Sequence, residues 1–502
     1  PASVRHIGSA FADNKTVRTV ALPRGLLDIG EGAFYQCSAL TAVSVPSGVR
    51  SVGRYAFRDC TSLIEAALPA SVTSVGEYAF YGCSALTSFA LPANALDLGE
   101  GAFSNCTALT SLTLPKKLAA IPPYFFAGCD AMTSFALPAG VTSVGEGAFS
   151  RCKALAFYTL PDTVTEVGTA LFANCTALES VGLPRGMTSI PENFFYGCTS
   201  LAELRVPEGV ISLDSGAFYD CKGLVSVTLP DTLTHIGEYA FTNCASLAEL
   251  ELPQSLTEIG DNAFYGCSAL PGLTIPASVT RLGEAAFYNC SGFSSFELPE
   301  TVRETGAYLL AGCTGLTSFT VPASLTALPD AFFYECTALE SVALPDTLVS
   351  IGEGAFTGCT ALRTIELPAS LETISPAAFA KSGLVSLTLP EGFAEVPDNL
   401  CFECASLETL TLPGSLVSVG AQAFYGCAAL RTLELPGALR TIAANAFSAC
   451  TGLTTVELPA LLTELDRDAF GQNDALVFLV YPSSVGLDYC LKGGREFRII
   501  KP

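Results

Sequence analysis

The segment Val144-Gly-Glu-Gly-Ala-Phe-Ser-Arg-Cys-Lys-Ala-Leu-Ala-Phe-Tyr-Thr-Leu-Pro161 returns along almost the whole chain with small changes. Its closing proline recurs every 23 residues from Pro23 to Pro368 and, after the loss of one residue, from Pro390 to Pro482. About 21 such units follow one another. A fixed period of this length predicts a solenoid, in which each unit is one turn and the stacked units bury a shared core.

Within one unit, the apolar residues alternate as they do in a half-buried strand. In Leu40-Thr-Ala-Val-Ser-Val-Pro46 we expect Leu40, Val43 and Val45 to point inward and the small or polar residues to point outward. The proline cannot donate a backbone hydrogen bond, so the strand ends there. A unit of 23 residues is too short for a strand and a full helix, which favours short strands, turns or 3₁₀ segments elsewhere in the turn.

The repeat pattern also predicts the domain organisation. Residues 1–482 are expected to form the solenoid, and residues 483–502, which break the pattern, are expected to form a C-terminal cap. Repeat arrays need such caps because a terminal unit has no neighbour to cover its apolar face.

Composition and charge exclude two classes of partner. The chain is 50% hydrophobic and carries a formal net charge of −23, with a sequence pI near 4.4. A surface this acidic repels phosphate backbones, so no nucleic acid is expected to bind. No run of residues approaches the ~18 apolar residues of a membrane-spanning helix, so no membrane insertion is expected.

The repeat closely resembles a known class. Several features recur at fixed spacing: a cysteine, a leucine, the Leu-Pro pair, an aliphatic residue before glycine, and Ala-Phe. The first three are seen in Cys83-Ser-Ala-Leu-Thr-Ser-Phe-Ala-Leu-Pro92. This pattern resembles the BspA-like, or Treponema-type, leucine-rich repeats. The resemblance implies a right-handed, curved superhelix of about 21 repeats with a parallel β-sheet on one face. It also implies a bacterial protein of the cell surface or a secreted one, with an adhesion role.

A few units depart from the pattern. Asn14 and Asn473 stand at the cysteine position in the first and last units, and Thr305 stands where an aliphatic residue is expected. In the unit that ends at Pro390, the cysteine position is interpreted as lost altogether, and in the next unit Cys401 replaces a phenylalanine. These changes motivate the hypothesis of a small kink near residues 375–405.

Eighteen of the 20 cysteines fall in one column, from Cys37 to Cys450. Equivalent positions in stacked units have parallel side-chain directions, which suit disulfide geometry poorly, so we interpret these residues as buried thiols. The exceptions are Cys401 and Cys490. Cys401-Phe-Glu-Cys404 lacks the second half of a zinc site and the setting of a redox enzyme, so it is interpreted as a core substitution.

Residues suited to catalysis are scarce. The two histidines, His6 and His235, have no distinctive nucleophile motif beside them, and we assign them structural or surface roles. Acidic residues recur at one turn position in many of the units, where they are expected to be solvated rather than to converge on a metal ion. The sequence therefore predicts no enzyme, no catalytic or metal site and no cofactor. The acidic turn residues are Glu31, Glu77, Glu100, Glu146, Glu238, Asp261, Glu284 and Glu353.

The outward strand positions form the candidate binding face. They carry mostly Thr, Ser, Glu and Ala, so the few larger or charged residues stand out. Tyrosines also recur directly after the phenylalanine of the repeat, as in Tyr196 and Tyr265, and packing between units is the favoured explanation for them. The candidate binding residues are Phe157, Arg205, Glu251, Glu297, Arg363, Glu366, Glu434 and Glu457.

Two functions remain open. One is adhesion to a protein or glycan through the solenoid surface, weak per unit and strengthened by multivalency. The other is a structural spacer that projects another domain and binds nothing itself. In either case we expect a monomer.

Overall fold

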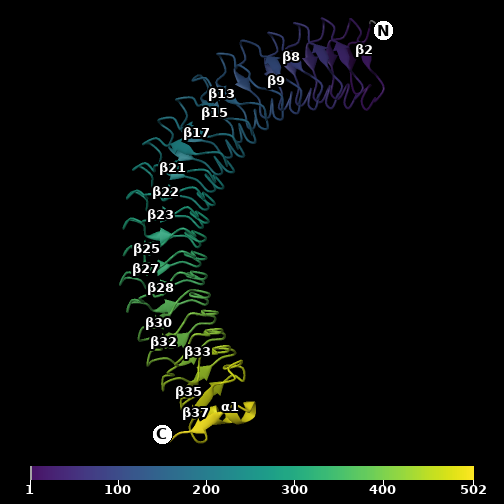
Figure 1. Cartoon of the computed structure of the whole chain (residues 1–502). Coiled ribbons are helices and arrows are strands. Elements are labelled where there is room, and N and C mark those ends of the chain that lie inside the picture. Colours follow the sequence, from purple (N-terminus) through teal and green to yellow (C-terminus); the bar gives the residue numbers. More distant parts are fainter. Residues whose placement is uncertain (1–2, 502) are drawn as a thin grey trace. The chain divides into compact units, whose positions relative to one another are not determined.

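The computed structural model describes residues 3–501, so residues 1–2 and 502 of the predicted segments lie outside it. The chain divides into two compact units, Pro1–Ser255 and Leu256–Pro502. Each unit is a parallel β-solenoid whose coils follow one another along the ribbon (Figure 1). The chain makes about 21 turns of about 23 residues, which confirms the predicted fold.

The first ladder of each unit, here called the front sheet, is built from the strands that precede the repeat proline. Their central side chains are buried and the flanking ones exposed, as the alternation predicted. In Pro1–Ser255 these strands are β2 (Thr19–Ala21), β4 (Ala42–Ser44), β6 (Glu65–Ala67), β8 (Ser88–Ala90), β10 (Ser111–Thr113), β13 (Phe157–Thr159), β15 (Ser180–Gly182), β17 (Glu203–Arg205), β19 (Ser226–Thr228) and β21 (Glu249–Leu250). In Leu256–Pro502 they are β25 (Ser318–Thr320), β27 (Ser341–Ala343), β30 (Ser386–Thr388), β32 (Thr409–Thr411), β35 (Thr455–Glu457) and β37 (Val477–Val480).

The second ladder, here called the side ladder, consists of two-residue strands that end on the aliphatic position of the repeat, which Thr305 occupies in one coil. In Pro1–Ser255 they are β1 (His6–Ile7), β3 (Asp28–Ile29), β5 (Ser51–Val52), β7 (Ser74–Val75), β9 (Asp97–Leu98), β11 (Ala120–Ile121), β12 (Ser143–Val144), β14 (Glu166–Val167), β16 (Ser189–Ile190), β18 (Ser212–Leu213) and β20 (His235–Ile236). In Leu256–Pro502 they are β22 (Glu258–Ile259), β23 (Arg281–Leu282), β24 (Glu304–Thr305), β26 (Ala327–Leu328), β28 (Ser350–Ile351), β29 (Thr373–Ile374), β31 (Glu395–Val396), β33 (Ser418–Val419), β34 (Thr441–Ile442) and β36 (Glu464–Leu465).

The remaining third of each coil is a tight turn that also bonds to its neighbour. The amide of Phe34 donates to the carbonyl of Ala56 in the next coil at 2.7 Å. Each turn needs left-handed backbone positions, such as Gly147 at φ 54° and Arg151 at φ 58°. A Cβ on Gly147 would lie 2.6 Å from the Tyr124 ring of the preceding coil, so this glycine also makes room for that ring.

The core is a stack of equivalent side chains. Phe218 is fully buried, and its ring lies 5.4 Å from that of Phe195 and 5.0 Å from that of Phe241. Such stacking contributes beyond the buried area alone. The phenylalanines of successive coils therefore form a buried column.

The cysteine column forms a second internal ladder. The Sγ of Cys221 donates to the carbonyl of Phe195 in the preceding coil at 3.1 Å, and the same contact recurs from coil to coil. In the last coil the side-chain amide of Asn473 donates to the equivalent carbonyl, that of Phe447, at 2.8 Å. Asparagine therefore replaces the cysteine here without loss of this hydrogen bond. The interpretation as buried thiols is confirmed.

One interpretation of the irregular unit is wrong. The cysteine position before Pro390 is not lost, because Ser382 occupies it and is buried there. The missing residue lies in the turn that follows, where Gly383 approaches the carbonyl of Thr360 so closely that a Cβ would lie 2.0 Å from it. The turn ladder continues through this unit, with Phe379 N donating to Leu400 O at 2.9 Å. The kink near residues 375–405 stays a prediction.

The segment after Pro482 has its own structure. Helix α1 (Val485–Gly493) begins at Ser484, whose hydroxyl accepts from the Leu487 amide, and ends at Gly494 in the left-handed conformation. Strand β38 (Phe497–Ile499) then pairs in parallel with β37. These are the signals expected of a well-defined helix, although the boundary of a cap at this point stays a prediction.

The phenylalanine column predicts a large difference between two identical substitutions. Phe218→Ala removes a buried, stacked ring and should lower the free energy of unfolding by about 3–5 kcal/mol. Phe157→Ala removes a ring that is 61% exposed and should cost less than about 0.5 kcal/mol. Chemical unfolding followed by circular dichroism measures both, and similar losses for the two variants would contradict the packing described.

The cysteine column predicts loss of stability in base. Burial raises the pKa of Cys106 to about 12, while an unfolded thiol titrates near ~8.5. Above that lower value the unfolded chain releases protons that the folded chain retains, so stability is complete below about pH 8.5 and falls as the pH rises further. The melting temperature should therefore drop steeply between about pH 9 and 11. A melting temperature that stays level over this range would contradict the protonated column.

Candidate binding surface

All eight candidate side chains are exposed. Phe157 opens β13, Arg205 closes β17, and Glu457 closes β35, so each lies at an outward position of the front sheet. Glu251 directly follows β21, and Glu297 forms an isolated bridge with Thr274. The remaining members, Arg363, Glu366 and Glu434, lie in front-sheet segments of their coils that are not assigned as strands.

Phe157 borders a shallow hollow on the front sheet of Pro1–Ser255. The strand β13 pairs with β15 so that Phe157 faces Ser180 and Thr159 faces Gly182. Because these neighbours are small, the coils leave a hollow of about 520 Å³ beside the exposed ring. Its lining has no charged residue: Phe135, Ala136, Leu137, Phe157, Tyr158, Thr159, Pro161, Ser180, Val181 and Gly182.

Arg205 lies one coil beyond Gly182 at the same strand position. Its guanidinium contacts Glu208 at 3.5 Å, and both side chains are largely exposed. An exposed pair of this kind contributes little to stability, so the guanidinium can exchange this partner for another. Phe157 and Arg205 thus supply an aromatic and a cationic side chain to this face.

The front sheet of Leu256–Pro502 carries four of the candidate glutamates. Glu297 borders a hollow of about 300 Å³, and Glu366 borders another of about 470 Å³. Glu434 and Glu457 lie in successive coils, because the residues before them, Leu433 and Val456, form a bridge. The hydroxyl of Tyr481 donates to Glu457 at 2.6 Å.

The eight residues do not converge on one catalytic centre. They line shallow hollows and rows, which suits an extended contact with a macromolecule. Within residues 3–501 no group of three or more His, Cys, Asp or Glu residues is arranged to hold a metal ion. In the same part of the chain, no helix is long and apolar enough to cross a membrane.

The tyrosines pack between coils, as expected from the sequence. The rings of Tyr196 and Tyr219 stack at 5.2 Å, and those of Tyr265 and Tyr288 at 5.0 Å. Hydrogen bonding to Glu146, burial and the charge of Glu146 raise the pKa of Tyr124 to about 12. These rings therefore support the turns rather than form a free aromatic stripe.

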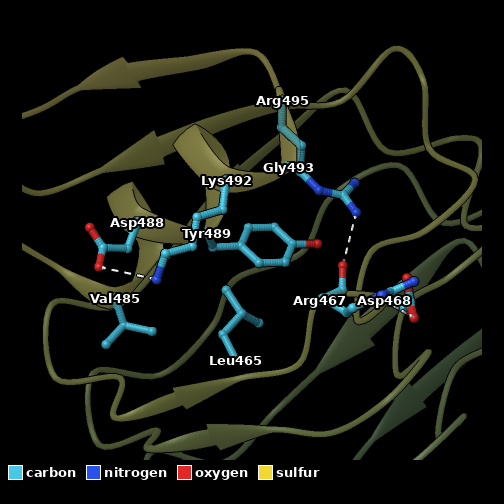
Figure 2. Close-up of a pocket in the computed structure, with 9 residues that line it drawn as sticks. All are labelled: Leu465, Arg467, Asp468, Val485, Asp488, Tyr489, Lys492, Gly493 and Arg495. Atoms are coloured by element: carbon cyan, nitrogen blue, oxygen red, sulfur yellow. Dashed lines mark hydrogen bonds and ion pairs between the residues drawn. The ribbon is translucent and has the colours of Figure 1, made fainter.

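Sequence reasoning missed a further hollow, of about 610 Å³, beside α1 (Figure 2). Arg495 is its key residue. The guanidinium donates to the carbonyls of Phe470 at 3.0 Å and Arg467 at 3.2 Å, and lies 4.7 Å from the Tyr489 ring. In a further coil, a cysteine thiol would donate to the Phe470 carbonyl. Arg495 takes the place of that thiol, so the ladder of donors to these carbonyls ends at Arg495. The only sequence signals were the helix limits, Ser484 and Gly494.

The repeat geometry and the front sheet now allow comparison with known proteins. The chain matches the BspA type leucine rich repeat region over residues 5–133, 119–244, 211–340, 326–413 and 398–487. The chain belongs to this family.

Several solved structures are similar to this member of the BspA type family. A leucine-rich repeat protein from Bacteroides ovatus ATCC 8483 is 27% identical over 86% of this chain and 88% of its own, with a TM-score of 0.51. The leucine rich cell surface protein from Faecalibacterium prausnitzii A2-165 is 26% identical over 72% of this chain and 87% of its own, with a TM-score of 0.42. The T. pallidum leucine rich repeat protein is 33% identical over 32% of this chain and 77% of its own, with a TM-score of 0.31.

No curated protein gives a significant match to the chain. Membership in the BspA type family makes the chain a repeat scaffold of the kind that mediates protein interactions. Leucine-rich-repeat solenoids are generally non-enzymatic.

The terminating role of Arg495 can be tested at the C-terminal end. Arg495→Met keeps much of the side-chain volume but leaves the carbonyls of Phe470 and Arg467 without these donors. We expect amide hydrogen exchange in α1 and β37 to quicken by about 10-fold or more, because two charge-assisted hydrogen bonds are lost. Arg498→Met, the same change at an exposed residue of β38, serves as the control. Equal exchange in the two variants would show that Arg495 does not hold this end.

Proposed function

We propose that the chain is a non-enzymatic adhesion protein, at the cell surface or secreted, that binds a host or microbial protein or glycan on its front sheet. The observation that supports this function most is the exposure of all eight candidate side chains at outward positions of that sheet. In a solenoid, side chains at outward positions are not part of the core, so they are free to contact a partner. The location is proposed from the resemblance to the BspA-like class.

The composition of the face supports avidity rather than one tight site. A strong hot spot is typically rich in Trp, Tyr and Arg, whereas this face is mostly Ser, Thr and Glu with single anchors such as Phe157 and Arg205. Contacts of this kind are individually weak. They become useful when many successive coils, or many copies on one surface, engage the same partner.

Charge reversal on the front sheet tests the proposal. Purified chain is screened against extracellular-matrix proteins and glycans in the presence of a reductant, and saturable binding is expected. For the acidic part of the face, the triple variant Glu251→Lys, Glu297→Lys and Glu366→Lys should weaken that binding by about 10-fold or more.

A matched control makes the same change of charge at three residues that lie outside the front sheet. Glu238→Lys, Glu284→Lys and Glu353→Lys alter exposed turn residues and should change affinity by less than about 2-fold. Equal loss in both triple variants would place the ligand elsewhere or make the effect one of net charge. No saturable binding by the unaltered chain would contradict the proposal and leave the spacer function.

A further inference from the structure

The coil that follows the shortened one, in Leu256–Pro502, brings two thiols together within one turn. The amide of Cys404 donates to the carbonyl of Cys401 at 3.2 Å, so the pair spans an i to i+3 turn. Both side chains are fully buried, and each thiol affects the pKa of the other. The Cα atoms of such a turn lie within ~7 Å of each other, which meets the requirement for a disulfide. In regular coils a phenylalanine at the Cys401 position prevents this contact.

The preceding coil offers Cys404 no competing thiol. Its column neighbour there is Ser382, whose hydroxyl lies 3.3 Å from the Cys404 Sγ. The Cys404 thiol also contacts the Phe379 carbonyl at 3.0 Å. On the other side, Cys427 belongs to the next coil. Equivalent positions in successive coils have parallel Cα–Cβ bonds, so their Cβ atoms stay about 4.8 Å apart, beyond the ~3.8 Å typical of a disulfide.

The environment also distinguishes the two thiols chemically. The hydrogen bond from Cys401, with those from Ser382, lowers the pKa of Cys404 below its ordinary value despite burial. Burial raises the pKa of Cys401 and of the column thiol Cys359. Cys404 is therefore the thiol of this coil that ionises first, and the thiolate is the form that reacts with an oxidant.

We propose that Cys401 and Cys404 are a reversible oxidation site that forms a disulfide with hydrogen peroxide as the oxidant. The Cys404 thiolate attacks one peroxide oxygen, the O–O bond breaks, and the released hydroxide takes up a proton to leave as water. The sulfenic acid that remains is attacked by the Cys401 sulfur, which loses its proton as the S–S bond forms and a second water leaves. Two thiols lose two electrons in total, and one peroxide gains them.

Because both thiols are buried, the reaction requires local opening of this coil. Two molecules of a small thiol reverse it and are themselves joined in a disulfide. In the oxidised coil, Cys404 no longer donates to the Phe379 carbonyl. We therefore expect faster amide exchange between residues 379 and 404 after oxidation.

Peptide mapping of the full chain tests the proposal. The folded protein is treated with hydrogen peroxide, quenched, unfolded and alkylated, then cleaved with trypsin. Lys381 and Arg431 bound a peptide that contains Cys401, Cys404 and Cys427. The expected product has an alkylated Cys427 and a mass lower by two hydrogens at the other pair, restored by dithiothreitol. Cleavage after Glu403 should leave two fragments joined by the disulfide.

Two variants make the outcome decisive. Cys401→Phe restores the regular column residue and leaves Cys404 without its partner in the coil, so the disulfide should disappear while the circular dichroism spectrum is retained. Cys427→Ser removes the neighbouring column thiol and should leave the disulfide unchanged. Full alkylation of Cys401 and Cys404 after peroxide treatment would overturn the proposal. A disulfide between Cys404 and Cys427, or oxidation spread evenly over the column, would do the same.

Discussion

Each inward side chain of this protein must pack against its own counterpart in the next coil, about 4.8 Å away. This constraint selects the core. A phenylalanine ring satisfies it by stacking, as Phe218 does between Phe195 and Phe241. A small thiol satisfies it by donating to a carbonyl of the coil before, as Cys221 does. A larger or branched polar side chain at these positions could neither stack on its counterpart nor donate to the preceding coil in every unit.

The same constraint explains how substitutions inside the core are accommodated. Asn473 donates to the carbonyl that a cysteine would otherwise bond, and Ser382 places a hydroxyl against Cys404. Thr305 does not find an equivalent solution, because its hydroxyl is buried without a hydrogen-bond partner among the described residues. The repeat therefore tolerates a changed side chain most readily where a short donor can reach the preceding coil.

Periodicity alone was sufficient to predict the solenoid, the inward and outward positions and the buried thiols, since each of these repeats many times. Single events were harder to place. The one-residue deletion could be assigned to the cysteine position or to the turn after it, and only the buried Ser382 shows that the turn was shortened. Arg495 reaches back 25 residues to the Phe470 carbonyl from outside the repeat, so no column predicted its role. The contact between Cys401 and Cys404 depends on side-chain directions within one turn, which spacing does not specify.

Outward side chains do not have to pack against a counterpart in the next coil, so unusual residues at these positions are informative about function. A substitution on the front sheet changes the free energy of unfolding little, so folding does not determine which residue stands there. Phe157 nevertheless exposes 61% of a large apolar side chain beside a hollow formed by Ser180 and Gly182. Exposing this ring forgoes the ~1.5–3 kcal/mol that its burial would contribute. Contact with a partner would recover part of that free energy, whereas a pure spacer gains nothing from the ring. The proposed binding function follows the same physical rule as the core: an apolar side chain such as that of Phe157 is more stable where a neighbour covers it.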